Sequence, residues 1–481
     1  MTGYVIALTI DHREAYTVWV EQAPVEVDNA DVPQPLDLSG LPDLDEEATT
    51  KAYAAALRDR LMAAAPVKVA LDDIFRRSGV AAPDLKFQLR HARCEGYSWE
   101  AIFNDKNDFL GLASRANLSR QVKSFGDRTD TGMFQPPLRM LAVMSALGIS
   151  ARPQWLALRN ALGKALSKRE VTLQVLVAEA KLRDDIVKEG LAGVTVDLIP
   201  ASATGLFTAI EDAAPHVLHF FCHGRIDERG QSLELMPAAG WMADDPTQAV
   251  NLGIQELCRE QAVRNSWLVV LNCCLGAAGV EDEGKTSFSM AMQLVKAGAA
   301  NAIGMSSPID AADAHVLAET FYARVVRDLG PLLGGAAGPV VLDFASALGK
   351  ARDALAGGNS PGRPYSTWTL PRLYEAMTPL RVVPVPRSGA PLAATAPTPA
   401  GSADAAAAMQ TRLQIVAAYL RNLPGDAPDS LRDAALALLQ QDPSIPRQAW
   451  PGRDGRMAET AAVEIELKLG EGRAMEEPDH A

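Results

Sequence analysis

Short apolar runs alternate with helical patterns through the middle of the chain. Each run is five to seven residues long, rich in large apolar side chains, and bounded by Gly or polar residues. Such runs are typical of strands buried on both faces of a parallel sheet. The runs are residues 138–144, 172–177, 194–199, 217–221, 267–272 and 300–305. Segments of helical composition separate most of them, at about 155–167, 182–189, 204–213 and 287–297. This alternation predicts an α/β fold with a mostly parallel sheet and helices on both faces, joined by right-handed crossovers.

The regions on either side of this pattern differ from it. Two runs at residues 4–10 and 15–21 predict strands in an N-terminal β-containing region, residues 1–130. We expect that region to pack against the sheet of residues 131–381. Residues 382–403 are rich in Pro and Ala and poor in large apolar groups, which predicts an extended linker.

The last part of the chain, residues 404–481, is predicted to be a small helical appendage with an acidic tail. Its apolar residues recur at steps of three and four, which places them on one helix face. They are Met409, Leu413, Val416, Leu420 and Leu423. Two short helices bury little surface alone, so this appendage is expected to dock on the main domain or to bind a partner.

Composition limits the classes of function. The chain has 481 residues, 48% of them apolar, and a net charge of -13. Without clustered Lys and Arg, a direct nucleic-acid partner is not expected, and a protein partner fits better. The N-terminus lacks a basic region and no run approaches eighteen apolar residues, so neither a signal peptide nor a membrane span is predicted. Five cysteines are too few for a disulfide framework, which favours a reducing cytoplasm.

Two of the apolar runs end in side chains that can carry chemistry. One run, HVLHFFCHG, ends at His223-Gly224, and the other, WLVVLNCC, ends at Cys274. The carboxyl ends of neighbouring parallel strands open onto one crevice, so the imidazole and the thiol can meet there. The thiolate is the attacking form of cysteine, and a nearby imidazole can take the thiol proton. His216 and His219 lie before or within the first strand and are expected to be structural.

The residues around these strand ends resemble the CHAT family of caspase-like peptidases. The resemblance begins with HFFCHG and LVVLNCC. It extends upstream to YSWEAIFNDKNDFLGLASRANLSRQ and downstream to LVKAGAANAIGM, AETFYARVV, ALGKARDAL and WTLPRLY. Matches in this order run from Tyr97 to Tyr374.

The resemblance implies a caspase-like cysteine endopeptidase that cleaves a partner protein. Cys274 would attack the peptide carbonyl, and His223 would act as general base and then as general acid. Backbone N–H groups of Gly224 and Cys274 would stabilise the oxyanion. No metal or organic cofactor is implied. By analogy with the family, the chain would act in a regulated prokaryotic defence or signalling system, with a protein substrate and a protein regulator.

Three departures from the family leave an alternative open. The polar residue, Thr and Gly that usually follow the family's Cys are replaced by Leu275-Gly276-Ala277, and its later Trp by Ser306-Ser307-Pro308. Cys273 also competes with Cys274 for the position of the nucleophile, although counting from LVVL favours Cys274. The alternative is a catalytically inert CHAT-fold module that binds a protein partner.

Two further hypotheses concern residues near the crevice. The acidic segment Glu281-Asp282-Glu283 either lines a specificity pocket for substrates with Arg or Lys before the scissile bond, or forms a solvated turn. Cys222, His223, Cys273 and Cys274 could supply sulfur and nitrogen to zinc. Adjacent residues on a strand point in opposite directions, however, so no metal site is predicted.

Overall fold

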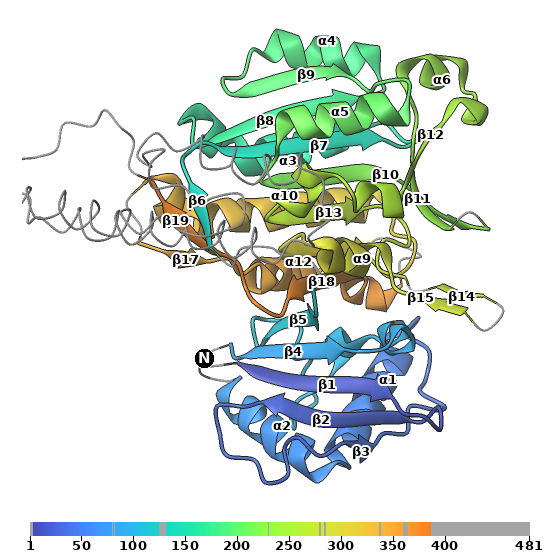
Figure 1. The fold of residues 1–481 in the computed structure, drawn as a ribbon, viewed down its shortest axis with the longest axis vertical. Helices are drawn as coiled ribbons and strands as arrows, with labels where there is room; N and C mark the ends of the chain where they lie inside the picture. The colour runs from blue at the N-terminus through green and yellow to red at the C-terminus, as the bar shows by residue number, and fades with distance from the viewer. Residues whose placement is uncertain are drawn as a thin grey trace, which may run out of the picture. The chain divides into compact units, whose positions relative to one another are not determined.

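Fourteen strands form one sheet in the computed structural model, which describes residues 3–78, 80, 82–124, 131–228, 230–278, 280–282, 285–335, 338–358 and 364–385. Its main path runs in the order β3-β2-β1-β4-β5-β18-β16-β13-β10-β7-β8-β9, from the blue N-terminal strands at the bottom of Figure 1 to β9 at the top. The six predicted parallel strands all form, side by side. They are β7 (Leu138–Ser145), β8 (Val171–Val177), β9 (Val194–Leu198), β10 (Val217–Asp227), β13 (Leu268–Asn272) and β16 (Asn301–Met305). The predicted mostly parallel sheet is confirmed.

Helices cover both faces of the sheet, as the alternating pattern predicted. On one face α3 (Arg152–Ser167) packs against α10 (Ala311–Asp328), which in turn packs against α12 (Ala345–Ala356). The other face carries α5 (Ala203–Ala213) against β7 and α9 (Met290–Ala297) against β13 and β16. The remaining elements of this part are α4 (Ala180–Glu189), α6 (Ala238–Ala243), α7 (Ile254–Leu257), α8 (Gln261–Arg264) and α11 (Gly330–Leu333).

The N-terminal region contributes strands to this same sheet. β4 (Asp84–Leu89) pairs with β5 (Asn117–Val122), which pairs with β18 (Pro371–Ala376). Three further strands complete this edge: β1 (Tyr4–Ile10), β2 (Tyr16–Gln22) and β3 (Gln34–Pro35). Two helices precede β4 in the chain: α1 (Glu47–Met62) and α2 (Ala65–Arg77). Strands β1 to β5 of the N-terminal region therefore belong to the same hydrogen-bonded sheet as the six parallel strands.

A buried ion pair explains the Trp-Glu segment and the later Ser-Arg. Arg120 of β5 donates from Nε to Glu100 Oε1 at 2.9 Å and from Nη2 to Oε2 at 2.8 Å. Neighbouring Trp99 is fully buried, stacks on Phe87 with ring centroids 5.3 Å apart, and donates to the Cys94 carbonyl. Breaking a buried pair of this kind costs about 3–5 kcal/mol, so these residues hold the Trp-Glu segment against β5.

Beyond its pairing with β13, strand β10 continues into an antiparallel ribbon. The last pair with β13 joins Phe221 to Asn272, after which β10 pairs with β11 (Gly230–Leu235). Strand β11 pairs in turn with β12 (Val250–Gly253). The sequence predicted a strand over residues 217–221 that stops at His223-Gly224, because these residues and the polar ones after them do not resemble a buried strand. The ribbon needs no second buried face, so its polar residues are accommodated.

Two small sheets complete the described part. Strand β19 (Arg381–Pro384) lies between β6 (Thr131–Phe134) and β17 (Val340–Val341). The first residues of the predicted linker therefore belong to a strand. The rest of that linker and the predicted C-terminal appendage lie outside the described residues. In the second sheet, β14 (Val280–Asp282) pairs with β15 (Lys285–Ser287).

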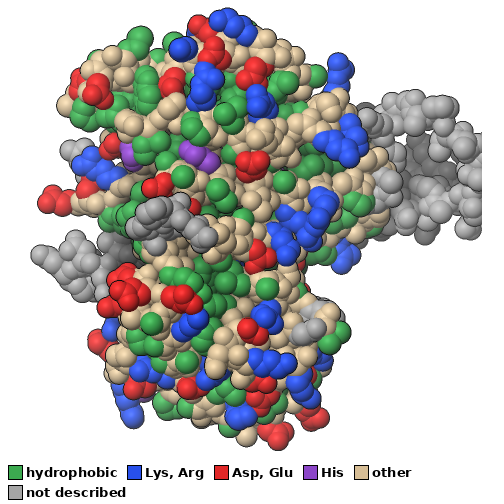
Figure 2. Space-filling view, turned by 180° about the vertical axis from the view of Figure 1, so that it is seen from behind, with side chains coloured by type: hydrophobic (Ala, Val, Ile, Leu, Met, Phe, Trp, Pro, Cys, Tyr) green, Lys and Arg blue, Asp and Glu red, His purple; other side chains and the backbone are tan. Residues whose placement is uncertain are grey.

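The described surface carries both signs of charge. On the face drawn in Figure 2, basic and acidic side chains are intermixed. Of the helices that the structure describes, none is both long and apolar enough to cross a membrane.

Candidate active site

Three adjacent strands, β7, β10 and β13, bring the candidate residues to one edge of the sheet. Phe221 pairs with Asn272 across β10 and β13, and Cys222 pairs with Ser145 across β10 and β7. His223 is the next residue of β10, and Cys274 lies two residues beyond the last residue of β13. The parallel register therefore places the histidine just beyond the parallel part of β10, beside the segment that follows β13.

The backbones at these two strand ends touch. A β-carbon built on Gly224 would lie 1.9 Å from the carbonyl oxygen of Cys274 and 3.4 Å from Cys273 Sγ. No other residue type fits at position 224 unless the two segments move apart. The structure thus brings His223-Gly224 and Cys273-Cys274 into direct contact.

A backbone carbonyl fixes the ring of His223. Its Nε2 atom lies 3.0 Å from the carbonyl oxygen of Leu147, in the turn that follows β7. A carbonyl oxygen only accepts hydrogen bonds, so Nε2 carries a proton and donates it. A neutral ring in this tautomer leaves Nδ1 as its basic atom. The sequence analysis missed Leu147, since every residue has a carbonyl and no side chain marks this one.

The environments of the two adjacent cysteines differ. Cys273 is 2% exposed, whereas Cys274 is only half-buried. The thiols of Cys273 and Cys222 are hydrogen-bonded; burial, reinforced by that bond, raises the pKa of Cys222 well above its usual value. Cys222 and Cys273 therefore form a buried thiol pair, and Cys274 is the more exposed cysteine of the adjacent pair.

A tight turn follows Cys274. Leu275 has a φ of 62°, in the left-handed region that costs a non-glycine residue about 1–2 kcal/mol. Two backbone hydrogen bonds hold the turn: Ala277 N–H donates to the Met305 carbonyl at 2.7 Å, and Ala291 N–H donates to the Gly276 carbonyl at 2.9 Å. A β-carbon on Gly304 of β16 would lie 2.5 Å from the Gly276 carbonyl carbon. The residues that depart from the family pattern therefore form a closely packed, strained turn.

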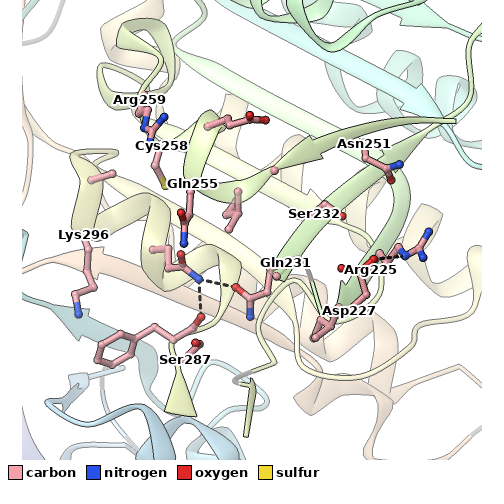
Figure 3. A pocket seen from close by; sticks show the side chains of 18 residues that line it. Arg225, Asp227, Gln231, Ser232, Asn251, Gln255, Cys258, Arg259, Ser287 and Lys296 are labelled. Carbon is pink, nitrogen blue, oxygen red and sulfur yellow. Dashed lines mark hydrogen bonds and ion pairs between the residues drawn. The ribbon is translucent and has the colours of Figure 1, made fainter. Parts of the chain in front are cut away.

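Two cavities lie near this turn: Gln231 connects the larger one to Ala278, and Ala278 itself lines the smaller one. The larger, about 1070 Å³, lies between the β10–β12 ribbon and helices α7 and α9 (Figure 3). There Gln293 Nε2 donates to Gln231 Oε1 at 2.5 Å and to the Phe288 carbonyl at 2.7 Å, while Gln231 Nε2 donates to the Ala278 carbonyl at 3.3 Å. These amides connect the turn after Cys274 to the start of α9.

The smaller cavity, about 610 Å³, lies on the β16 side of the turn. Ala278 and the segment Ser306–Asp310 contribute to its wall. Arg372 of β18 lines it as well, although it is only 4% exposed. The sequence analysis missed Arg372; an Arg inside the apolar run WTLPRLY was the available signal.

The predicted acidic segment lies in and after β14. Glu281 and Asp282 belong to that strand, and Glu283 lies outside the described residues. Its role in substrate preference stays a prediction.

The other histidines of the first strand are held inside the fold. His216 Nδ1 accepts a hydrogen bond from the Arg139 N–H at 3.0 Å. The fully buried ring of His219 lies between two polar groups, with Nε2 3.0 Å from Gln154 Nε2 and Nδ1 3.0 Å from the Tyr322 hydroxyl oxygen. Burial lowers the pKa of each histidine to about 3, so both stay neutral. Within the described part of the chain, no group of three or more His, Cys, Asp or Glu residues is arranged to hold a metal ion.

Comparison with known proteins identifies the family of this chain. A mostly parallel α/β sheet with a histidine and a cysteine at adjacent strand ends is the architecture of the caspase-like class. The family model for the CHAT domain matches residues 78–368, which is more than half of the chain. The chain belongs to the CHAT domain family.

Two similar solved structures are crystal structures of the Saccharomyces cerevisiae separase-securin complex, at 2.6 and 3.0 Å resolution. Each is 11% identical to this chain, with a TM-score of 0.33. The matches cover 63% and 62% of this chain, but only 16% and 15% of the matched chains. No curated protein matches the chain.

Proposed function

We propose that this CHAT protein is a cysteine endopeptidase that cleaves a partner protein. One observation carries the proposal: His223, fixed by the Leu147 carbonyl, precedes Gly224, whose backbone touches that of Cys274. A nucleophile, a base and a group that orients the base are the parts that covalent catalysis by a thiol requires. The three come from the ends of three adjacent strands, so a rigid sheet positions them.

The mechanism follows from the tautomer. Nδ1 of His223 takes the proton of Cys274, and the thiolate attacks the substrate carbonyl. The imidazolium keeps its Nε2–H bond to Leu147, and that bond strengthens when the ring is charged. Backbone N–H groups of Gly224 and Cys274 receive the oxyanion.

The later steps reverse the proton transfer. His223 returns its proton to the nitrogen of the leaving amine, which departs as the C–N bond breaks and leaves an acyl-enzyme on Cys274. His223 then takes a proton from water, which attacks the acyl carbon and frees the thiol. Neither a metal nor an organic cofactor enters this scheme. By analogy with the family, the substrate and regulator are proteins of a prokaryotic defence or signalling system in the cytoplasm.

A second candidate function is partner binding by a catalytically inert module. The observation that favours it is the turn after Cys274, where Leu275 replaces the family's polar residue and adopts a left-handed conformation. In this case the crevice binds a protein but does not cut it.

Adjacent cysteines provide a matched pair of variants to separate the two candidates. Wild type, Cys274→Ala, Cys273→Ala and His223→Ala are incubated with a cell lysate, and new N-termini are identified by mass spectrometry. We expect Cys274→Ala to abolish cleavage and Cys273→Ala to retain it. Loss of the general base lowers the rate about 10²- to 10⁴-fold. Cleavage that survives Cys274→Ala, or that disappears only with Cys273→Ala, contradicts the assignment.

A further inference from the structure

The 610 Å³ cavity lies against the turn that follows the proposed nucleophile. It shares Ala278 with that turn, and exposed Ser307 and Pro308 form part of its outer wall. Ser306-Ser307-Pro308 stands where the family usually has a Trp. Small side chains at this point leave the cavity open beside the turn that follows Cys274.

Arg372 lines this cavity and is held there by neutral groups. Its guanidinium donates to the Glu95 carbonyl at 2.6 Å, to the Ser98 hydroxyl at 3.3 Å and to the Ala277 carbonyl at 3.5 Å. Its Nε is buried and has no hydrogen-bond partner among the described residues. The Ala277 contact ties the guanidinium directly to the turn after Cys274.

The buried surroundings of Arg372 carry excess positive charge. Arg120 and Arg352 are equally buried, and both lie within ion-pair distance of a single carboxylate, Glu100. Glu95 offers Arg372 its backbone carbonyl, while its carboxyl group, whose pKa is raised by burial, accepts from the Tyr374 hydroxyl at 2.9 Å. A desolvated cation that lacks a counter-ion attracts an anion strongly, since little water screens it.

Three carboxylates also line the cavity, but their positions weaken their repulsion of an incoming anion. Asp45 and Asp310 are exposed to solvent, which screens them. Asp310 is also the N-cap of α10, where it accepts from Ala312 N–H at 2.8 Å. Asp313, in the first turn of α10, is stabilised by the helix dipole and has an interaction of its own. Among the described charged residues that line the cavity, Arg372 is therefore the one that an added counter-ion would stabilise most.

We propose that this cavity binds an acidic side chain of the substrate, at the residue before the scissile bond, and that Arg372 is its charge partner. The inference rests on the proposed peptidase function. It predicts a preference for Glu or Asp over Gln, Leu, Lys and Arg at that substrate position. The hypothesis of a basic preference, based on Glu281–Glu283, predicts the opposite order.

Binding and cleavage are measured separately, so that the two proposals fail separately. Fluorescein-labelled hexapeptides of sequence Ala-Ala-Ala-Xaa-Ala-Ala, with Xaa as Glu, Gln, Leu or Lys, are titrated into the Cys274→Ala protein and followed by anisotropy. The same peptides are given to wild type to measure kcat/KM. We expect the Glu peptide to bind and react about 10- to 100-fold better than the Gln peptide, as for hydrogen bonds to charged groups.

Three variants locate the effect. Arg372→Gln is expected to remove the Glu over Gln preference, chiefly through KM, while Arg259→Gln, an exposed cation of the larger cavity, leaves it unchanged. Ser307→Trp alters an exposed position, so its folding is not at risk. It is expected to weaken binding of the Glu peptide about tenfold or more by filling the cavity. If Arg372→Gln fails to fold, Ser307→Trp decides the question.

Each outcome has one meaning. Preferential binding of the Glu peptide without cleavage supports the cavity assignment and contradicts the peptidase. Cleavage that depends on Cys274 but favours Lys, or that does not distinguish Glu from Gln, keeps the peptidase and overturns the role of Arg372. Equal binding of all four peptides to Cys274→Ala also overturns it.

Discussion

Substitution of Gly224 by alanine tests the contact on which the site depends. The new methyl group would lie 1.9 Å from the Cys274 carbonyl oxygen, whereas ordinary contacts begin near 3.4 Å. The ends of β10 and β13 would therefore have to separate by about 1.5 Å. Overpacking of this kind costs about 1–3 kcal/mol of stability. A shift of about 1 Å in reacting groups lowers the rate on the order of 100-fold.

A matched glycine provides the control. Gly163 lies within α3, and apart from the helix's own backbone and the adjacent residues, no atom of the described residues lies within 4 Å of the position that a β-carbon would take there. Gly163→Ala is therefore expected to stabilise the protein by about 0.5–1 kcal/mol. Urea unfolding gives the free energy of unfolding for both variants, and peptide cleavage gives kcat/KM. Gly224→Ala is expected to lose about 1–3 kcal/mol and most of its activity. Wild-type stability and activity in Gly224→Ala would refute the contact between the two strand ends.

Three further predictions concern the supports of the site. Glu100→Gln is expected to lower the free energy of unfolding by about 3–5 kcal/mol at neutral pH, since it leaves Arg120 buried without a counter-charge; urea titration measures the loss. Burial alone would raise the pKa of Glu100, but Arg120 lowers it to about 2. The ionised carboxylate of Glu100 thus contributes its full stability above about pH 4.5 and loses it as the pH falls towards 2. In Glu100→Gln, the free energy of unfolding should therefore depend less on pH in this range; an unchanged dependence contradicts this. Gln293→Leu removes the bonds to Gln231 and Phe288 and is expected to lower kcat several-fold with little change in fold by circular dichroism; unaltered kcat would show that these amides do not steady the turn. Gly304→Ala should destabilise by about 1–3 kcal/mol, because its methyl group would meet the Gly276 backbone; differential scanning calorimetry that shows no decrease would disprove the close approach.

Most of the parallel strands that the sequence predicted are continuous runs of mainly apolar side chains. Runs such as residues 267–272 are buried throughout, so their pattern needs no tertiary information. Strand β18 has no such pattern, because Arg372 and Glu375 lie within it. Both are buried, and Glu375 is paired with Lys86 at 2.5 Å. Partners from distant segments offset the cost of burying these polar residues. The sequence pattern of the strand alone does not reveal those partners.

Some features of the candidate site could likewise be predicted from the sequence, and others could not. His223 and Cys274 were identifiable because their chemistry resides in the side chain and each follows an apolar strand. The Leu147 carbonyl could not be identified, since only the fold selects one carbonyl among hundreds. The partial exposure of Cys274 beside buried Cys273 likewise depends on how β10 and β13 pack, which the doublet alone does not specify.

The most direct test of the proposed dyad is to locate the reactive thiol. The native protein is treated with a small excess of a peptidyl acyloxymethyl ketone, and the modified residue is identified by tryptic mass spectrometry. The same treatment is applied to His223→Ala and Cys273→Ala. We expect one adduct on Cys274 in wild type and Cys273→Ala, and at least tenfold less of it in His223→Ala. Three results would contradict a Cys274/His223 peptidase: an adduct on another cysteine, equal labelling of Cys274 in wild type and His223→Ala, or no labelling at all.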